Sequence, residues 1–426
     1  MELLTIIGGG LAGSEAAFQA AERGCKVHLY EMRPDKETPA HTTGNLAELV
    51  CSNSLGSFLP DRASGLLMDE LSKLGSLLLK IAREAIVPSG GSLSVDRDFF
   101  SRKITSILEN HPRIKVIREE CLIIPESPAI IASGPLTSSR LATSLSNFTK
   151  KDNLFFFDAI APIIIQESID FSIAFKASRF AEEKGQSADY VNCPLSKDEF
   201  DHFVYELTSA KCKPLKKYEN EIADGVRTGK GKFFEACLPI EVIASRGRKA
   251  LSFGPMRPIG LMDPRTGCRP YAVLQLRQEN LSASLYNMVG FQTNLTFSEQ
   301  NRVCRLIPGL KNAEFVRYGQ MHSNTYLCAP ALLLPSLQTK KRADLFIAGQ
   351  LAGVEGYLGN IASGLLAGLN AANFVQGMEV CVFPPSTLIG ALTRYITECS
   401  EKSFQPMKAN FGLLPELEDG SVPRPE

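Results

Sequence analysis

The 426-residue chain has no excess of charge of either sign, because 46 Lys and Arg balance 46 Asp and Glu. A net charge of zero supplies no overall field that would attract nucleic acid or an acidic membrane, so any polyanionic partner must be met by a local basic surface. The chain also lacks the apolar run of roughly 18–20 residues that a membrane span needs. Its start carries an acidic Glu2 and no basic region. We therefore expect a cytoplasmic protein without a signal peptide.

Closely spaced cysteine pairs are missing as well. Eleven cysteines are present, but no two lie within four residues of each other, which excludes CxxC redox motifs and zinc ribbons. The chain has only five His, and none stands near a cysteine in a ligand-like pattern. We expect no metal site, and mostly free thiols in a reducing compartment.

What is present indicates a large globular protein. Apolar residues make up 44% of the chain, enough to bury the cores of two or three domains. The start reads as strand, helix, strand: an apolar run over 3–7, a helix over 14–23 and a second strand over 26–30. This order implies a parallel sheet.

The same α/β character returns near the end of the chain. DLFIAG, from Asp344, reads as a strand that ends in glycine, and 361–374 is a helix of small residues suited to close packing. We predict an α/β fold with a Rossmann-like dinucleotide-binding domain built from 1–150 and 331–426, the latter including a C-terminal helical tail. Residues 151–330 would form an inserted α+β domain that binds the substrate.

The turn GGGLAG is the clearest motif. It supplies Gly8, Gly10 and Gly13 in GxGxxG spacing between a strand and a helix. These glycines permit a tight turn, the approach of backbone amides to a pyrophosphate, and close packing of helix on sheet, while Glu31 can bind a ribose hydroxyl. The motif predicts that the turn binds a dinucleotide, either FAD or NAD. The alternative is a glycine-rich turn that binds no ligand. The expected contacts are Gly8, Gly9, Gly10, Leu11, Ala12, Gly13 and Glu31.

A second glycine-rich strand–helix junction lies far downstream, in AGQLAGVEGY and the ASG that follows it. A helix N-terminus there could face the other end of a long cofactor, which favours FAD. The alternative is simple packing of a Gly/Ala-rich helix.

One local excess of positive charge is present. Residues 211–277 hold 14 Lys and Arg against 6 Asp and Glu. The segment is either a solvated face or a surface that contacts phosphates.

The stretch LVCSNSL places Cys51 between apolar and small polar residues. Such a thiol can be buried filler, a metal ligand, half of a disulfide or a nucleophile.

The motifs taken together resemble the TrmFO family, the folate- and FAD-dependent tRNA (uracil-5-)-methyltransferases, which are related to GidA-type flavoproteins. Matching stretches run nearly from end to end, among them IIGGGLAGSEAA, YEMRP, AELVCSNSL, FFEACLPIEV, FGPMRPIGL, LYNMVGFQT and AGQLAGVEGY.

The resemblance implies methylation at C5 of a uridine, in tRNA the T-loop uridine. Methylenetetrahydrofolate would donate the carbon, reduced FAD the electrons, and NAD(P)H would be a co-substrate. Cys51 and Cys237 match the family's two catalytic cysteines. One thiolate would add at C6 of uracil and so activate C5, and the other would act as acid or base at C5. We favour Cys51 as the nucleophile, but the sequence does not assign the two roles.

The resemblance also suggests weaker site residues. Tyr357 could stack on folate or flavin, or pack in the core. Arg277 and Asn280 could meet folate or RNA, or belong to a strand pair. The basic segment encloses Cys237, which favours RNA contact. Expected flavin-binding positions are Arg33, Gly134 and Gly349.

Three positions depart from the family pattern. Gly56 stands where a basic residue is usual and Gly359 where an acid is usual, and Ser323 after Met321 and His322 is also unusual. These departures put substrate choice in question, so ribosomal RNA stays open beside tRNA. A flavin oxidoreductase acting on a small molecule and a catalytically idle RNA-binding flavoprotein are the other hypotheses.

Overall fold

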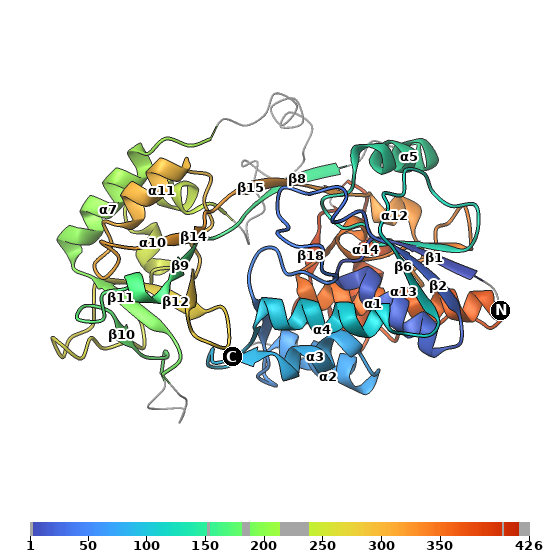
Figure 1. Cartoon of the computed structure of the whole chain (residues 1–426), viewed down its shortest axis with the longest axis horizontal. Coiled ribbons are helices and arrows are strands. Elements are labelled where there is room, and N and C mark those ends of the chain that lie inside the picture. The colour runs from blue at the N-terminus through green and yellow to red at the C-terminus, as the bar shows by residue number, and fades with distance from the viewer. Residues whose placement is uncertain (1–2, 151–153, 181–187, 214–237, 403, 417–426) are drawn as a thin grey trace.

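A computed structural model describes residues 3–150, 154–180, 188–213, 238–402 and 404–416. These residues form two lobes (Figure 1). One lobe unites the two ends of the chain, drawn mostly in blue to teal and in orange to red, and the other holds the middle of the chain, drawn mostly in green, yellow and light orange. None of the described helices combines the length and the apolar character needed to cross a membrane.

A five-stranded parallel sheet lies at the centre of the first lobe, in the order β16-β7-β1-β2-β6. The short runs LLTII and AII are buried almost throughout, as expected for strands covered on both faces. The strand of this sheet that comes last along the chain, β16, pairs with β7 from the first third, so the predicted Rossmann-like α/β fold is confirmed. The strands are β1 (Leu3–Ile7), β2 (Lys26–Tyr30), β6 (Ile114–Ile117), β7 (Ala129–Ile131) and β16 (Leu345–Ile347).

Two helices that open at glycine turns pack against each other beside this sheet. They are α1 (Leu11–Glu22) and α13 (Tyr357–Val375). Both begin earlier than the sequence pattern predicts, because glycine turns run directly into their first turns. A Cβ added at Gly364 would lie 2.2 Å from the carbonyl oxygen of Ala12, so only glycine permits this close approach.

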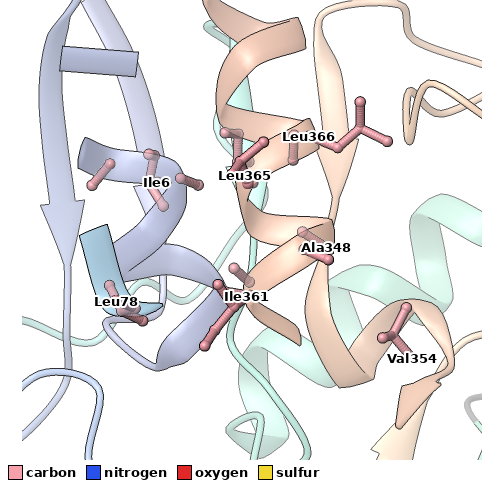
Figure 2. Close-up of a cluster of buried hydrophobic side chains, with 14 of the residues drawn as sticks. Ile6, Leu78, Ala348, Val354, Ile361, Leu365 and Leu366 are labelled. Carbon is pink, nitrogen blue, oxygen red and sulfur yellow. The ribbon is translucent and has the colours of Figure 1, made fainter. Parts of the chain in front are cut away.

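The core of the first lobe forms where these helices meet the sheet. Figure 2 shows Ile6 of β1, Leu78 of α3 (Leu77–Glu84), and Ile361 and Leu365 of α13 in one buried cluster. The remaining helices of the lobe are α2 (Ala63–Lys73), α4 (Arg97–Glu109), α5 (Ser139–Thr149), α12 (Ala329–Leu332) and α14 (Leu388–Glu398). Two small sheets complete it: β3 (Ser54–Ser57), β5 (Ser92–Val95) and β4 (Ile86–Val87), and β17 (Val354–Glu355) with β18 (Met407–Lys408).

The second lobe is a six-stranded antiparallel sheet in the order β10-β11-β12-β13-β9-β14. Apolar side chains of one face pack with its helices into a separate core. The strands are β9 (Ile163–Ile165), β10 (Phe175–Lys176), β11 (Val191–Leu195), β12 (Ala272–Gln278), β13 (Leu285–Met288) and β14 (Phe315–Arg317). The helices among the described residues of this lobe are α7 (Lys197–Ser209), α9 (Ile240–Ser245), α10 (Ala250–Phe253) and α11 (Phe297–Cys304).

One antiparallel pair connects the lobes (Figure 1). In it β8 (Leu154–Ala159) pairs with β15 (Met321–Tyr326), so the chain enters and leaves the second lobe along the same path. Both strands lie just inside the domain boundaries placed at 150 and 330, and those boundaries stay predictions.

Candidate functional site

The glycine turn between β1 and α1 opens onto a cavity of about 1000 Å³. The end of β2, the segment after β7 and the start of α13 complete its walls. The walls include five predicted cofactor positions from the turn, the start of α1 and the residue after β2: Gly8, Gly10, Leu11, Ala12 and Glu31.

Each glycine of this turn has the structural role that the motif predicts for it. Gly8 has φ +102°, and a Cβ there would lie 2.5 Å from the carbonyl oxygen of Ala132. A Cβ at Gly13 would lie 1.8 Å from the carbonyl oxygen of Gly8. Gly10 lines the cavity, and a Cβ there would meet nothing within 4 Å. Because α1 begins directly after Gly10, its first amides and positive dipole end are available to a phosphate.

Glu31 is held in place by a buried network. Its carboxylate accepts the N–H of Gly9 at 2.9 Å and the Nε–H of Arg33 at 2.9 Å. The Nη1 of Arg33 also donates to Glu48 at 3.0 Å. Burial by itself would raise the pKa of Glu31, but the hydrogen bonds and charge of Arg33 outweigh it and lower the pKa. Glu31 therefore stays ionised, ready to accept a ribose hydroxyl.

This network refines two of the predicted contacts. The amide of Gly9 is used by Glu31, and Gly9 is not among the residues that line the cavity. Arg33 lines the cavity, yet its side chain is only 4% exposed because it is bound between two carboxylates. Arg33 thus holds the carboxylate of Glu31 in place.

The other predicted flavin positions, Gly134 and Gly349, lie on the same cavity. Gly134 has φ +69° and open space where a Cβ would be. Gly349 has φ +76°, and a Cβ there would lie 2.9 Å from the Cβ of Ala12. Both glycines keep side chains out of the cavity, so its shape and its donors fit a dinucleotide such as FAD. Among the described residues, no group of three or more His, Cys, Asp or Glu is placed to hold a metal ion.

A second cavity of about 1360 Å³ adjoins the first. Cys51, Ser52 and Arg277 line it from one side, and Gly356 and Lys408 from another. The residues that line both cavities are Val50, Pro135, Leu136, Gln350, Tyr357 and Asn360. Residues 49–53, which we call the thiol segment because they include Cys51, thus lie directly beside the place expected for the flavin.

Tyr357 holds the backbone of this thiol segment. Its hydroxyl oxygen accepts the N–H of Cys51 at 2.9 Å and the N–H of Ser52 at 3.1 Å. Burial, with Cys51 nearby, raises the pKa of Tyr357, so the phenol stays protonated. Tyr357, which the sequence predicts to stack on folate or flavin or to pack in the core, therefore also supports the thiol segment.

Three arginines contact the same segment. Arg97 donates to the carbonyls of Leu49 at 2.7 Å and Cys51 at 3.1 Å. Arg317 donates to the carbonyl of Val50 at 2.9 Å. Arg277 donates to Ser52 Oγ at 2.5 Å and to Asn53 Oδ1 at 2.8 Å.

These arginines bring positive charge close to the segment that carries Cys51, and Glu279 offsets part of it through its ion pair with Arg97. Burial would lower the pKa of Arg97, but the carboxylate of Glu279, 2.7 Å away, outweighs it and raises the pKa. Burial lowers the pKa of Arg277 and of Arg317 from their ordinary values. Guanidinium groups nevertheless remain charged at neutral pH, and nearby cations favour a thiolate over a thiol.

Sequence reasoning identified Arg277 in this group and missed Arg97, Arg317 and Glu279. Arg97 directly follows the helix cap Asp96, where a basic residue is unremarkable. Only the folded chain brings Arg97, Arg317 and Glu279 close to the segment that carries Cys51.

Asn280 has a local role in the structure. It lies in the turn between β12 and β13, and its Oδ1 accepts the N–H of Ser284 at 3.1 Å while its Nδ2 donates to Ser284 Oγ at 2.8 Å. It lines neither of the two cavities. These contacts match the alternative of a residue that belongs to a strand pair.

Cys237 lies outside the described residues. The chain is described again from Leu238, and the N–H of Ile240 donates to the carbonyl of Gln292 at 2.7 Å. Gln292 lines the second cavity. The described end of this segment therefore lies at the cavity wall.

Two of the positions that depart from the family pattern line the second cavity. Gly56 has φ +119°, and Gly359 has Val354 Cγ1 2.7 Å from where a Cβ would be. Both positions accommodate glycine and leave no room for an unstrained longer side chain. The side chain of Ser323 lies outside the described part of the structure.

Comparison with known proteins identifies the family of the chain. The family described as "Glucose inhibited division protein A" matches residues 3–379. A protein of Exiguobacterium sibiricum named methylenetetrahydrofolate–tRNA-(uracil-5-)-methyltransferase TrmFO is 53% identical over 428 residues, which cover 100% of this chain and 96% of the relative. A Bacillus subtilis protein of the same name is 52% identical over 416 residues, 98% of this chain and 93% of the relative.

Among solved structures, Aquifex aeolicus GidA in its form II crystal matches with a TM-score of 0.68 and 18% identity, over 92% of this chain and 67% of that chain. This likeness concerns the fold alone. On the sequence matches, the chain belongs to the TrmFO family, within the wider GidA group.

Proposed function

We propose that this protein methylates C5 of a uridine in tRNA, with methylenetetrahydrofolate as the carbon donor, FADH₂ as the reductant and NAD(P)H as the source of its electrons. The observation that carries the proposal is that Cys51 lines a cavity sharing six residues with the dinucleotide cavity. A thiol in that position can reach a base that also faces the cofactor. The family relationship supplies the substrate and the donor.

Cys51 is the nucleophile in this proposal. Its thiolate adds to C6 of uracil, the Sγ–C6 bond forms, and the electron pair of the C5=C6 bond moves towards O4, which makes C5 nucleophilic. The guanidinium groups of Arg97 and Arg277 favour the thiolate, and Tyr357 fixes the backbone that carries it. Bound FADH₂ supplies the hydride that turns the transferred carbon into a methyl group.

Cys237 is the proposed acid or base at C5. After carbon transfer the C5 proton must leave, and the Sγ–C6 bond must break to restore the ring. Support comes from the family motif and from the hydrogen bond that ties Ile240 to the cavity-lining Gln292.

An RNA substrate also needs exposed basic residues that can contact its phosphates. Arg246, Arg248 and Lys249, in the basic stretch after α9, are all exposed. Arg248 is 75% exposed even though it pairs with Asp201. Such residues can neutralise RNA phosphates while the target base is flipped from its stack.

The test is a methylation assay with purified protein. Methylenetetrahydrofolate labelled in its one-carbon unit, NAD(P)H, and separate tRNA and ribosomal RNA transcripts are supplied, and nucleosides are analysed by mass. Labelled 5-methyluridine from tRNA is expected. Product from ribosomal RNA alone would replace the proposed substrate, and label taken from S-adenosylmethionine would contradict the reaction.

Cysteine variants test the roles. Cys51→Ala and Cys237→Ala should each abolish product, whereas Cys268→Ala, which removes an exposed thiol, should keep wild-type activity. A covalent RNA adduct that survives in Cys237→Ala but not in Cys51→Ala would assign the nucleophile to Cys51. The reverse pattern would exchange the roles.

A further inference from the structure

Asn324 of β15 carries a side-chain amide at the wall of the second cavity. The residue is only 4% exposed, yet it lines the same cavity as Cys51. None of the described residues donates a hydrogen bond to this amide or accepts one from it. Buried amides are nearly always paired, because an unpaired polar group loses its water without compensation. The amide of Asn324 therefore indicates a ligand in the cavity.

A ligand in the cavity can reach this amide. Among the described residues, the side-chain nitrogen and oxygen atoms that are both sealed from solvent and unpaired are Asn287 Nδ2 and Arg394 Nε. The unpaired amide atoms of Asn324 are not among them, so they keep accessible surface. Because Asn324 lines the second cavity, that surface opens into it.

Two other amides of the cavity wall are already paired. Gln350 Nε2 donates to Glu355 Oε1 at 2.8 Å, and Asn360 Nδ2 donates to the carbonyl of Gly356 at 2.7 Å. Both bonds stay within the chain around the start of α13. The open pairing at Asn324 is therefore not a general property of the polar groups on this wall.

The fold holds Asn324 where the two cavities meet. Its strand, β15, pairs with β8 along its whole length. The next residue, Thr325, donates its N–H to the carbonyl of Pro135 at 2.9 Å. Pro135 lines both cavities. A paired strand thus fixes the amide beside the place expected for the flavin.

A primary amide complements a lactam, which is a ring carbonyl next to a ring N–H. The Nδ2–H of asparagine donates to the carbonyl while its Oδ1 accepts from the N–H, so one planar group satisfies both atoms. Uracil carries this edge at C4=O and N3–H. The pterin ring of methylenetetrahydrofolate also carries it at C4=O and N3–H. The two ring systems of the proposed reaction therefore share the edge that an asparagine can bind.

We propose that Asn324 binds the lactam edge of a ring that enters the second cavity. This proposal rests on the proposed function and deepens it, because it names the chemical group that the site recognises. The amide is satisfied only when that ring is bound, so rings without the edge are rejected. Where the ring is uracil, the Nδ2–H also stabilises O4 as negative charge develops there.

Asn324→Leu is the first test, because leucine is close in shape and can neither donate nor accept. The amide has no protein partner to lose, so the midpoint of thermal unfolding should equal or exceed that of the wild type. Methylation at low ligand concentration should slow by about tenfold to a hundredfold, as when a bidentate pair is removed. Loss of thermal stability in parallel with activity would indicate a structural role and overturn the proposal.

Two measurements identify the ring that is bound. The first is the affinity of the flavin-loaded protein for tetrahydrofolate without RNA, read from the change in flavin absorbance. The second is kcat/KM for tRNA at saturating methylenetetrahydrofolate. If the ring is the pterin, Asn324→Leu should weaken the first by about tenfold or more and spare the second, and if it is uracil the effects should be reversed. No change in either measurement would refute the proposal.

Sulfur in place of the C4 oxygen tests the contact itself. Sulfur is a weaker hydrogen-bond acceptor, so the wild type should prefer the oxygen form of the ring it binds. The pairs to compare are tRNA with uridine or 4-thiouridine at the target, and tetrahydrofolate or its 4-thio analogue. In Asn324→Leu the preference for one of these pairs should shrink by about tenfold. Unchanged preferences for both pairs would overturn the contact with the lactam.

Asn301→Leu is the matched control. Asn301 is partly buried, donates to the hydroxyl of Tyr318 at 2.6 Å and lines neither cavity. This variant should leave the affinity for tetrahydrofolate, the rate of methylation and both preferences unchanged. Absence of product from the wild type on every RNA would contradict the proposed function itself. An active wild type whose Asn324→Leu variant behaves in the same way would contradict only this inference.

Discussion

At the scale of single residues, the Tyr357 hydroxyl is the acceptor for two adjacent amides of the thiol segment. Tyr357→Phe removes that acceptor and leaves both donors without it. We expect unfolding free energy to fall by about 1–3 kcal/mol. Methylation should slow by about 10- to 100-fold, because a small displacement of the nucleophile is costly.

Urea unfolding and single-turnover methylation measure the two effects of Tyr357→Phe. Tyr395→Phe is the matched control, because that hydroxyl makes only one long bond, 3.4 Å to the carbonyl of Gln405, at the surface. Equal effects of the two variants would show that Tyr357 does not support the thiol segment.

His41, on the wall of the dinucleotide cavity, predicts a pH dependence. Burial, with the cationic Arg33 nearby, lowers the pKa of His41 from 6.5 to about 4. As the pH falls below about 6.5, His41 therefore becomes protonated in the unfolded chain but stays neutral in the folded chain. The free energy of unfolding decreases as a result until about pH 4. The stability that neutral His41 supplies is fully present only above pH 6.5.

Unfolding experiments at pH 7 and pH 5 test this expectation. His41→Asn should lose less stability than the wild type over that interval, and His202→Asn, at an exposed histidine, should behave like the wild type. The pKa values of Glu31 and Glu48 are lowered below 4.5, so these groups titrate at still lower pH. Identical pH profiles for wild type and His41→Asn would contradict the expectation.

At the scale of elements, the contact between α1 and α13 positions the helix end that faces the cofactor. Gly364→Ala would place a methyl 2.2 Å from the carbonyl oxygen of Ala12, in the first turn of α1. The helices must separate, which should cost about 1–3 kcal/mol and displace the first amides of α1 beside the dinucleotide cavity.

The ratio of bound flavin to protein, read from absorbance, should therefore fall in Gly364→Ala. Asn373→Ala is the control on the same helix, since Asn373 is only partly buried and bonds locally to the carbonyl of Glu379 at 3.1 Å. Full flavin content in Gly364→Ala would mean that the close approach of α1 and α13 does not govern the cofactor site.

At the scale of the whole molecule, polar contacts hold the second lobe against the thiol segment of the first. Arg97, at the start of α4, forms two hydrogen bonds with Glu279, which follows β12. Asn53 Nδ2 donates to the carbonyl of Gln278 at 2.8 Å. The lobes meet again where the N–H of Gly90 donates to Asp189 at 2.6 Å.

Glu279→Gln would leave the Arg97 guanidinium without its anion. With side chains 13% and 4% exposed, the pair is largely buried, and breaking such a pair costs about 3–5 kcal/mol. We expect methylation to fall while flavin content is kept, because the dinucleotide cavity belongs to the first lobe.

Calorimetry and flavin absorbance check Glu279→Gln. The control Asp69→Asn breaks an exposed pair with Lys73, 63% and 77% exposed, and should cost less than about 1 kcal/mol. Loss of flavin in Glu279→Gln would show that the lobes are coupled more widely than through the thiol segment.

Local patterns sufficed for much of this protein. The run LLTII, the turn GGGLAG and Glu31 after the second strand are close in sequence, so their spacing alone predicts strand, turn and helix, and the Rossmann-like fold is confirmed. The family was likewise predictable from ordered motifs, and the comparisons confirm it. The catalytic assignments to Cys51 and Cys237 stay predictions.

The sequence by itself determined the α/β fold, the dinucleotide turn and the family. Tertiary structure alone decided the environment of the thiol: Arg97 lies 46 residues from Cys51, and Tyr357 lies 306 residues from it. It also decided that Asn280 closes a turn. The physical reason is that periodicity and turn chemistry act over a few residues, whereas hydrogen bonds across sheets and between lobes depend on where the folded chain brings distant residues together.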